Sequence, residues 1–270
     1  MNEPAASESP AWQPLTPRGA AAFARAPLAR LLLVQAAVAV LCSAAIAWFI
    51  HRDWFPVIRE AVHQLPAEGA IRGGRLEWPD GAPPRVLAAG GFLAIVVDPA
   101  HSGAVREPTD LLLEFGSRDL WICSLGGCRV WAYPAGRDRA FNQPESEPWW
   151  GAWGPPWLAV VTAASGIWLI ASWACLATLY AGPVWVMLFL ARRRMALAEC
   201  WKLCGAAVLP GALFMSGAIV LYGLGILDLV HLAAASAAHL VLGWVYAAVS
   251  PWFVPRIAEG SSARNPFQGS

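Results

Sequence analysis

Two polar side chains, Ser216 and His239, lie in long apolar stretches and could act together. The stretch from 205 to 254 is fifty residues long, and its ionisable side chains are Tyr222, Asp228, His231, His239 and Tyr246. As one straight helix it would be about 75 Å long, so it must fold back into two spans of a ~30 Å hydrocarbon core. In antiparallel neighbours Ser216 would lie ~16 Å from the inner boundary and His239 ~14 Å from the outer one, so their depths coincide. Such a pair could be a catalytic dyad, carry a proton or ion, or join two helices by a hydrogen bond.

The strings MSGAIVLYGL and AAHLVLGW around these residues resemble the serine and histidine segments of rhomboid intramembrane proteases. The resemblance implies an intramembrane hydrolase that uses Ser216 and His239. Three features depart from that family: Phe214 replaces the first glycine of the serine motif, the chain has four spans rather than at least six, and the two segments lie on consecutive helices. Small residues in AAASAA favour a structural contact between helices. We therefore expect no catalytic residue, and keep a hydrolase, or a minor transporter or channel subunit, as the alternative function.

Cys123 and Cys128 lie in the string LWICSLGGCRVW. If SLGG is a four-residue hairpin loop, the cysteines face each other across two strands, with Cα atoms about 4.5 to 5.5 Å apart and within reach of a disulfide. A zinc site would need a second pair of ligands, and His101 alone does not complete one. We expect a disulfide, with two free thiols as the alternative.

A second cysteine pair, Cys200 and Cys204, lies in RRRMALAECWKLC. A helix would place the two cysteines one turn apart. Its apolar stripe would consist of Leu197, Trp201, Cys204 and Val208, which predicts an interfacial helix on the inner leaflet. Lipidation of a cysteine or metal binding is the alternative. The residues expected to contact lipid at this interface are Arg192, Arg193, Arg194, Trp201 and Lys202.

The rest of the sequence gives no sign of a reaction or a cofactor. It contains no phosphate loop, paired-carboxylate pattern or nucleic-acid motif. We expect Asp98, Asp110 and Glu114 to be solvated or to form turns. We therefore expect no cofactor, no resident metal and no nucleic-acid partner.

The composition is that of a membrane protein, with 57% hydrophobic and 14% charged residues, whereas soluble domains carry roughly 25% charged residues. A span needs about 20 apolar residues, and the sequence predicts spans over 29–50, 157–180, 205–224 and 230–250. The apolar run from Trp157 to Ala191 would be ~52 Å long as one helix. We therefore expect a break at Gly182 and Pro183, followed by a bent or interfacial helix over 184–204.

The orientation follows from the distribution of Lys and Arg. With four spans, the basic segments before the first span, after the second and in the tail all fall on one side. The connection over 51–156 instead carries 13 acidic and 10 basic residues. The positive-inside rule then predicts cytoplasmic termini, with a disordered segment over 1–28 and a tail over 251–270, and an outer location for 51–156. The rival interpretation is a signal peptide cleaved after AIA at 45–47, but the apolar run is longer than a usual signal core.

Two structures are predicted between the first and second spans. The segment 51–66 forms an outer amphipathic helix whose apolar stripe consists of Trp54, Val57, Ile58, Ala61, Val62 and Leu65. Short β-like runs separated by Gly, Pro and Asp follow, and they predict an antiparallel unit over about 68–135 within a domain of 67–148. A unit of ~70 residues is marginal alone, so we expect it to lean on the helix, the bilayer or a partner.

The order of these parts resembles that of Yip1-type and related bacterial four-span membrane proteins. The resemblance is carried by LP at 65–66, IRGGRL, FLAIVVD and LAECWKLCGAAVLP. It implies a membrane scaffold or a trafficking-associated role without catalysis, and it transfers no functional residue.

The sequence thus predicts an α-helical integral membrane protein with four transmembrane helices and a small extracytoplasmic all-β domain inserted between helices 1 and 2. We expect it in the inner membrane of a bacterium, as a non-enzymatic scaffold that presents the β domain to a partner. The expected partners are membrane lipids and an envelope or membrane protein, with a homo-oligomer as a further possibility.

Overall fold

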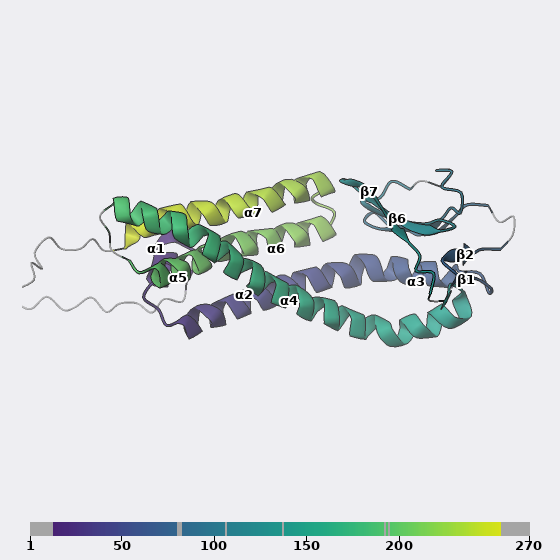
Figure 1. Cartoon of the computed structure of the whole chain (residues 1–270), viewed down its shortest axis with the longest axis horizontal. Coiled ribbons are helices and arrows are strands. Elements are labelled where there is room, and N and C mark those ends of the chain that lie inside the picture. Colours follow the sequence, from purple (N-terminus) through teal and green to yellow (C-terminus); the bar gives the residue numbers. More distant parts are fainter. Residues whose placement is uncertain are drawn as a thin grey trace, which may run out of the picture. The chain divides into compact units, whose positions relative to one another are not determined.

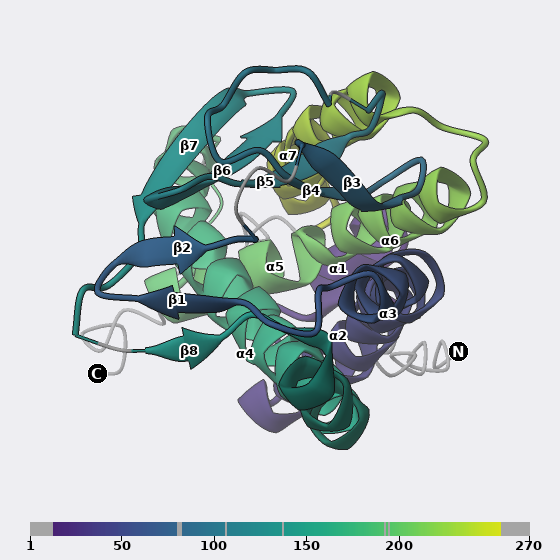
Figure 2. The same cartoon turned by 90° about the vertical axis from the view of Figure 1, so that its right-hand side faces the viewer.

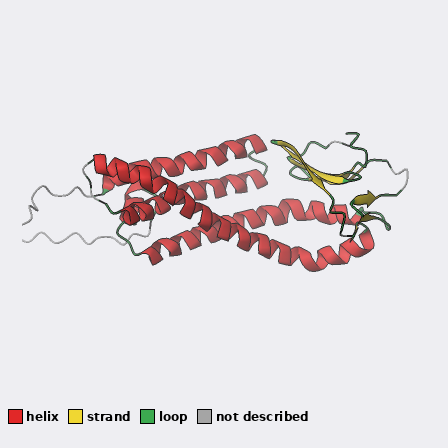
Figure 3. Ribbon diagram, in the orientation of Figure 1, coloured by secondary structure: helices red, strands yellow, loops and turns green. Residues whose placement is uncertain are grey.

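Four helices of the computed structural model are long and apolar enough to cross a membrane: Leu28–His63, Gln143–Leu190, Leu197–Gly223 and Leu229–Phe253 (Figure 1). Two β-sheets lie in sequence between the first and the second of them (Figure 3). The structure describes residues 13–79, 83–105, 107–136, 138–191, 193 and 195–254. The prediction of four apolar helices plus a separate β region is confirmed.

The chain forms two compact units, and the long helices contribute residues to both. The first unit comprises 1–42, 165–216 and 234–270, and small side chains fill much of its core. Ala177 and Ala181 of α4 pack there with Cys200 and Cys204 of α5 (Leu197–Ala207). Gln35 of α2 (Leu28–Phe49) donates from Nε2 to the Gly205 carbonyl oxygen at 3.1 Å and so joins two helices.

The N-terminal segment contains a helix where disorder was expected. Helix α1 spans Pro17–Ala22, and the side chain of Thr16 caps it by accepting from the Gly19 N–H at 3.0 Å. A capping threonine, a proline at the first position and three alanines all favour a helix. The expected cytoplasmic segments before 13 and after 254 lie outside the described residues.

The second candidate span is one uninterrupted helix. Helix α4 runs over Gln143–Leu190 and passes through Gly182 and Pro183, so the predicted break is wrong. A proline removes only one backbone hydrogen bond, and Val184 and Leu188 just beyond it are buried in the core of the first unit. The bent helix expected over 184–204 is instead the end of α4 and, after a loop, α5.

The last two long helices follow each other along the chain and are joined by a short turn. Helix α6 (Leu209–Gly223) ends before Gly225, whose φ is 73°. Asp228 then caps α7 (Leu229–Val249) by accepting the His231 N–H at 2.8 Å, and a 3-10 turn follows over Ser250–Phe253. The turn lies between the predicted spans 205–224 and 230–250, and the glycine and the aspartate there are typical of a helix end and a helix start.

The second unit comprises 43–164 and 217–233 and contains both sheets. The smaller sheet is antiparallel in the order β2 (Arg75–Glu77), β1 (Ala70–Arg72) and β8 (Arg139–Ala140). Gly73 and Gly74 join β1 to β2 with φ angles of 54° and 75°. A two-residue hairpin loop with two positive φ angles is a turn that glycine adopts without steric cost.

The larger sheet has the order β3 (Arg85–Ala89), β4 (Ala94–Val97), β5 (Leu111–Phe115), β6 (Asp119–Ser124) and β7 (Gly127–Ala132) (Figure 2). Its neighbours are antiparallel except β4 and β5, which are parallel. The prediction of a purely antiparallel unit is therefore wrong at its centre. A parallel pair requires a crossover. Here it is the connection over 98–110, whose described residues 98–105 and 107–110 contain no helix.

The amphipathic helix completes the core of this unit. A π-helical turn (Ile50–Trp54) connects α2 to α3 (Phe55–His63) without a break. The predicted stripe, with Ala61 and Leu65 at its centre, packs against Leu87, Ile95 and Val97 of the larger sheet. The helix and the β unit thus share one hydrophobic core, which explains how so small a β unit is stabilised.

Candidate functional site

The two cysteines of LWICSLGGCRVW link the two strands of a hairpin formed by β6 and β7. Cys123 lies directly opposite Cys128, and the two are joined by a disulfide. Ser124 pairs with Gly127, so the loop consists of Leu125 and Gly126 rather than the four residues of SLGG. Gly127 has a φ of 94°, which a side-chain-bearing residue would adopt only with strain.

Strand β7 is exposed along its whole length. All six of its residues are exposed, including Val130 at 56% and Trp131 at 62%. β7 is the last strand in the sheet order, so its outer edge has no neighbouring strand in the part of the chain that the structure describes (Figure 2). Large apolar side chains on an unpaired edge are typical of a surface that binds another chain.

One face of β7 continues the apolar face that forms the core. Leu113 and Phe115 of β5 pack against the core that α3 covers. Their cross-strand partners in β6 are Ile122 and Leu120, and Leu120 in turn lies opposite Trp131. The apolar face therefore begins under the helix and ends uncovered at the rim of the sheet.

The crossover lies on the opposite face of the sheet, where the contacts of His101 hold it in place. His101 Nδ1 lies 2.6 Å from Oε1 of Glu114 in β5, and Nε2 lies 2.7 Å from Oδ1 of Asp119 in β6. The imidazole also stacks on Trp121, with ring centroids 4.3 Å apart and planes 22° apart. The backbone of His101 has a φ of 51°, a conformation held by these contacts at both ring nitrogens.

This arrangement favours a protonated histidine. Ionised carboxylates only accept hydrogen bonds, so an imidazolium satisfies both contacts at once. Burial by itself lowers the pKa of His101, but the hydrogen bonds and charges of Glu114 and Asp119 outweigh it, and the pKa lies above its usual value. Among the described residues no group of three or more His, Cys, Asp or Glu is placed to hold a metal ion. The cluster is therefore a fastening for the loop.

The three acidic residues expected to be solvated or turn-forming include two buried ones. Asp98 is 1% exposed and Glu114 is 7% exposed. Oδ2 of Asp98 accepts from Ser102 Oγ at 2.8 Å and from the Gly103 N–H at 2.9 Å. Burial raises the pKa of Asp98, but these hydrogen bonds bring it below its usual value. The solvated interpretation is wrong for both residues. Asp98 does form a turn, as the alternative expected, whereas Glu114 lies within β5 in contact with His101 of the crossover.

The third of these residues, Asp110, joins the crossover to the end of α6. Its Oδ2 accepts a hydrogen bond of 2.5 Å from the hydroxyl of Tyr222. Tyr222 also packs against Phe92 and Phe49, with ring centroids 4.7 and 5.3 Å away. Asp110 is thus a structural anchor within the second unit.

Ser216 and His239 do not form a hydrogen-bonded dyad. Ser216 Oγ donates to the carbonyl oxygen of Ala212, four residues earlier in its own helix, at 3.0 Å. His239 Nδ1 has no hydrogen-bond partner. The two helices do approach closely near His239, since a Cβ added to Gly211 would lie 2.4 Å from the His239 carbonyl oxygen. The hydrogen bond that could have joined the two helices is therefore absent, and Gly211, which lies outside AAASAA, lets their backbones approach.

The basic segment after α4 is described only at Arg193, because Arg192 and Arg194 lie outside the described residues. Arg193 is buried, and its guanidinium lies over the Trp252 ring at 5.5 Å from the centroid. Nη1 donates to three carbonyl oxygens of the C-terminal turn, those of Pro251 (3.0 Å), Trp252 (2.9 Å) and Val254. A cation near the last carbonyls of a helix also interacts favourably with the helix dipole. Arg193 therefore ties the end of α4 to the end of α7.

Trp201 and Lys202 likewise make contacts within the first unit. Trp201 Nε1 donates to Thr178 Oγ1 at 3.0 Å, and Lys202 Nζ donates to the Ala26 carbonyl oxygen at 2.8 Å. Cys200 is fully buried, and so is Cys204 of the predicted stripe, whereas Leu197 at the start of the stripe is exposed. The buried part of the stripe therefore packs on protein rather than on the leaflet surface. The interfacial interpretation of this helix is wrong on that face, because α1 and α4 cover it. Lipid contact by the basic segment remains a prediction.

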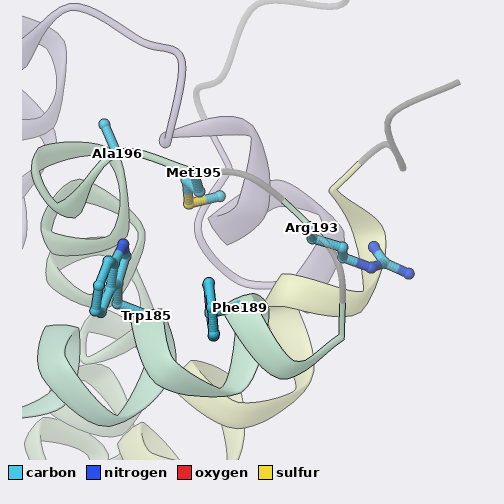
Figure 4. Close-up of a pocket in the computed structure, with 5 residues that line it drawn as sticks. All are labelled: Trp185, Phe189, Arg193, Met195 and Ala196. Atoms are coloured by element: carbon cyan, nitrogen blue, oxygen red, sulfur yellow. The ribbon is translucent and has the colours of Figure 1, made fainter. Parts of the chain in front are cut away.

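A pocket of about 380 Å³ lies beside this segment, lined by Trp185, Phe189, Arg193, Met195 and Ala196 (Figure 4). The two rings stand side by side on α4, with centroids 6.3 Å apart. The guanidinium of Arg193 points away from them, toward the C-terminal turn (Figure 4). These lining residues include no carboxylate, imidazole, hydroxyl or thiol side chain, so the pocket lacks the groups of a catalytic centre.

A scan against protein-family models and searches of curated proteins and of solved structures found no match to this chain. The resemblance to Yip1-type proteins therefore stays an expectation from the sequence. The geometry of the exposed hairpin is the feature that can carry a functional argument.

Proposed function

We propose that this chain is a multi-pass membrane scaffold without enzymatic activity, which displays its β unit outside the cytoplasm and binds a protein partner through the outer edge of β7. The observation that carries the proposal is the exposure of all six residues of β7 on an edge that no strand covers among the described residues.

The chemistry of that edge favours a protein over other ligands. A free edge offers a row of backbone N–H and C=O groups, and an added strand satisfies them in register. Val130 and Trp131 supply apolar contact area beside them. Natural sheets usually blunt such an edge with proline, bulges or several charges; β7 contains no proline and one charge, Arg129, and its register with β6 is regular.

The outer location is supported by two independent features. Arginines concentrate near the span ends that would share the cytoplasmic side, whereas 51–156 carries more acidic than basic residues. A disulfide such as Cys123–Cys128 persists in oxidising compartments, which include the bacterial periplasm. The proposed topology therefore has cytoplasmic termini and an extracytoplasmic β unit in the inner membrane.

Site-specific photo-crosslinking in intact cells tests the proposed function. A benzophenone amino acid would replace Val130, and the matched control would replace Ala89, an exposed apolar residue on the edge strand at the other end of the sheet. We expect protein adducts from position 130 and none from position 89. Adducts with lipid alone, equal adducts from both positions, or no adduct from position 130 would contradict the proposal.

Reporter fusions test the topology separately. A periplasm-dependent reporter inserted after His101 should be active, and the same reporter at either terminus should be inactive. The reverse pattern would place the β unit in the cytoplasm and remove the basis for its oxidised hairpin.

A further inference from the structure

We infer that the partner of β7 is a second copy of this chain, which adds its own β7 in antiparallel orientation so that two sheets join across a twofold axis. This inference rests on the proposed function, because it names the occupant of the same edge.

The backbone of β7 presents its even-numbered residues to the open edge. The N–H of Tyr133, directly after the strand, donates to the carbonyl oxygen of Arg118 on the side of β6 at 3.1 Å. In an antiparallel ladder, residues alternate between those bonded to the neighbour and those directed away from it. Odd-numbered residues of β7 therefore bond to β6, whereas Cys128, Val130 and Ala132 direct their N–H and C=O groups outward.

Only registers that set outward residues opposite outward residues can form a hydrogen-bonded ladder between two copies. With Val130 opposite Val130 of the partner copy, Cys128 lies opposite the partner copy's Ala132, and the reverse pair forms by symmetry. All three outward residues are then used, and the ladder has about six hydrogen bonds. A shift that centres the axis on Trp131 leaves only residues 130–132 of β7 paired.

The side chains favour the same register. Arg129 then lies opposite Trp131 of the partner copy, and the twofold axis creates this pair twice. A guanidinium over an indole ring is a favourable contact, and Trp131 is 62% exposed in the single chain and free to make it. The register centred on Arg129 instead sets two guanidinium groups opposite each other, which is unfavourable. The open edge of β7 is therefore complementary to itself in one register.

Two differently tagged copies of the full chain, expressed together in the membrane, test the inference. With the benzophenone residue at position 130 of one copy, we expect an adduct that carries both tags and has about twice the 28.9 kDa mass of the chain. The same residue at position 89 is the control and should give no such adduct. Adducts only with a different protein would overturn self-pairing and leave the proposed function standing, whereas no adduct at all would overturn both.

A charge exchange tests the register. Trp131→Lys sets two cations against each other at both Arg129 pairs and should weaken the two-tag adduct about tenfold. Trp131→Glu should keep the adduct within about threefold, because a carboxylate opposite Arg129 is also favourable. The double variant Arg129→Glu/Trp131→Lys restores opposite charges and should recover the adduct. Equal membrane abundance and an intact Cys123–Cys128 disulfide establish that each variant folds; failure of the double variant to recover would overturn the register.

Discussion

The two edges of the five-stranded sheet are built differently, although they belong to one small unit. At the β3 edge the register shifts between Val86 and Ala88, so that Leu87 forms a bulge, and Leu87 and Ala88 are buried in the core shared with α3. Arg85 at the start of that strand donates to Gln64 Oε1 at 2.5 Å. The β7 edge has a regular register, no covering helix among the described residues, and no buried side chain.

Within one sheet, the β3 edge therefore contributes to stability, and the β7 edge is available for interaction. The bulged and covered edge cannot accept another strand, and its side chains contribute to the core. The open edge contributes little apolar burial to the unit and keeps its backbone groups available. Substitutions at the two edges should therefore have different consequences, and the following predictions begin with the largest effect.

The first prediction compares apolar truncations at the two edges. Leu87→Ala should lower the free energy of unfolding of the β unit by about 2–5 kcal/mol, because it leaves a cavity under α3. Val130→Ala should change it by less than about 0.5 kcal/mol, yet weaken crosslinking from a benzophenone residue placed at Ala132 of β7. Pulse proteolysis of the full chain in detergent with increasing urea measures both. An effect of Val130→Ala as large as that of Leu87→Ala would contradict the separation.

The second prediction concerns the His101 fastening, which holds the crossover against β5 and β6. The folded pKa of His101 is raised, so its stabilisation is fully present below the unfolded pKa of about 6.5 and is lost as the pH rises through the folded value. The protection factors of amide exchange over residues 98–110, corrected for the intrinsic base-catalysed rise in rate, should therefore fall at alkaline pH. Glu114→Gln should remove most of this pH dependence and cost about 1–3 kcal/mol. If the opening of the crossover were independent of pH, the claim that His101 is protonated would be wrong.

The third prediction concerns the Cys123–Cys128 disulfide, which links β6 to the edge strand β7. Cys123→Ser/Cys128→Ser should cost about 2 kcal/mol, since the disulfide closes only a short loop. The effect should stay within β6 and β7, because the core under α3 contains neither cysteine. Amide exchange of the hairpin compared with that of β4 measures this. Global unfolding of the β unit in the serine variant would show that the hairpin is part of the core.

The fourth prediction, which has the smallest effect on stability, tests which backbone N–H groups of β7 point toward the open edge. Val130→Pro removes an outward N–H and should cost about 1 kcal/mol or less, but it should abolish pairing of the edge. Arg129→Pro is the matched control, because it removes an N–H that bonds to β6 and should destabilise the hairpin more strongly. If the two prolines cost the same, the assignment of inward and outward residues is wrong.

Features that depend on local sequence could be predicted. The four long apolar runs are visible because a span requires length and apolarity together. The apolar stripe through Ala61 could be identified because a helical period is a local property, whereas its packing against the sheet was one of three alternatives left open beside the bilayer and a partner. The pairing of Cys123 with Cys128 followed from a turn flanked by two β-like runs.

Features that depend on contacts distant in sequence could not be predicted. The parallel pairing of β4 with β5 has no local signature, and the burial of Asp98 and Glu114 is a consequence of it. His101 was noted as an isolated ligand, because nothing in the sequence brings it between Glu114 and Asp119. Pro183 failed as a helix breaker because packing of α4 compensates for one lost hydrogen bond. The open edge itself follows from the strand order, which the sequence does not reveal.

Residue-resolved hydrogen exchange of β7 tests the central claim most directly. It would compare the full chain at one copy per nanodisc with the chain at high density in native membranes. At one copy, the N–H groups of Arg129 and Trp131 should be protected and those of Val130 and Ala132 should exchange rapidly. At high density, the account predicts that Val130 and Ala132 become protected as well, while residues 85–89 are unchanged. Rapid exchange of Val130 and Ala132 under both conditions would show that the β7 edge stays unpaired and would contradict the account.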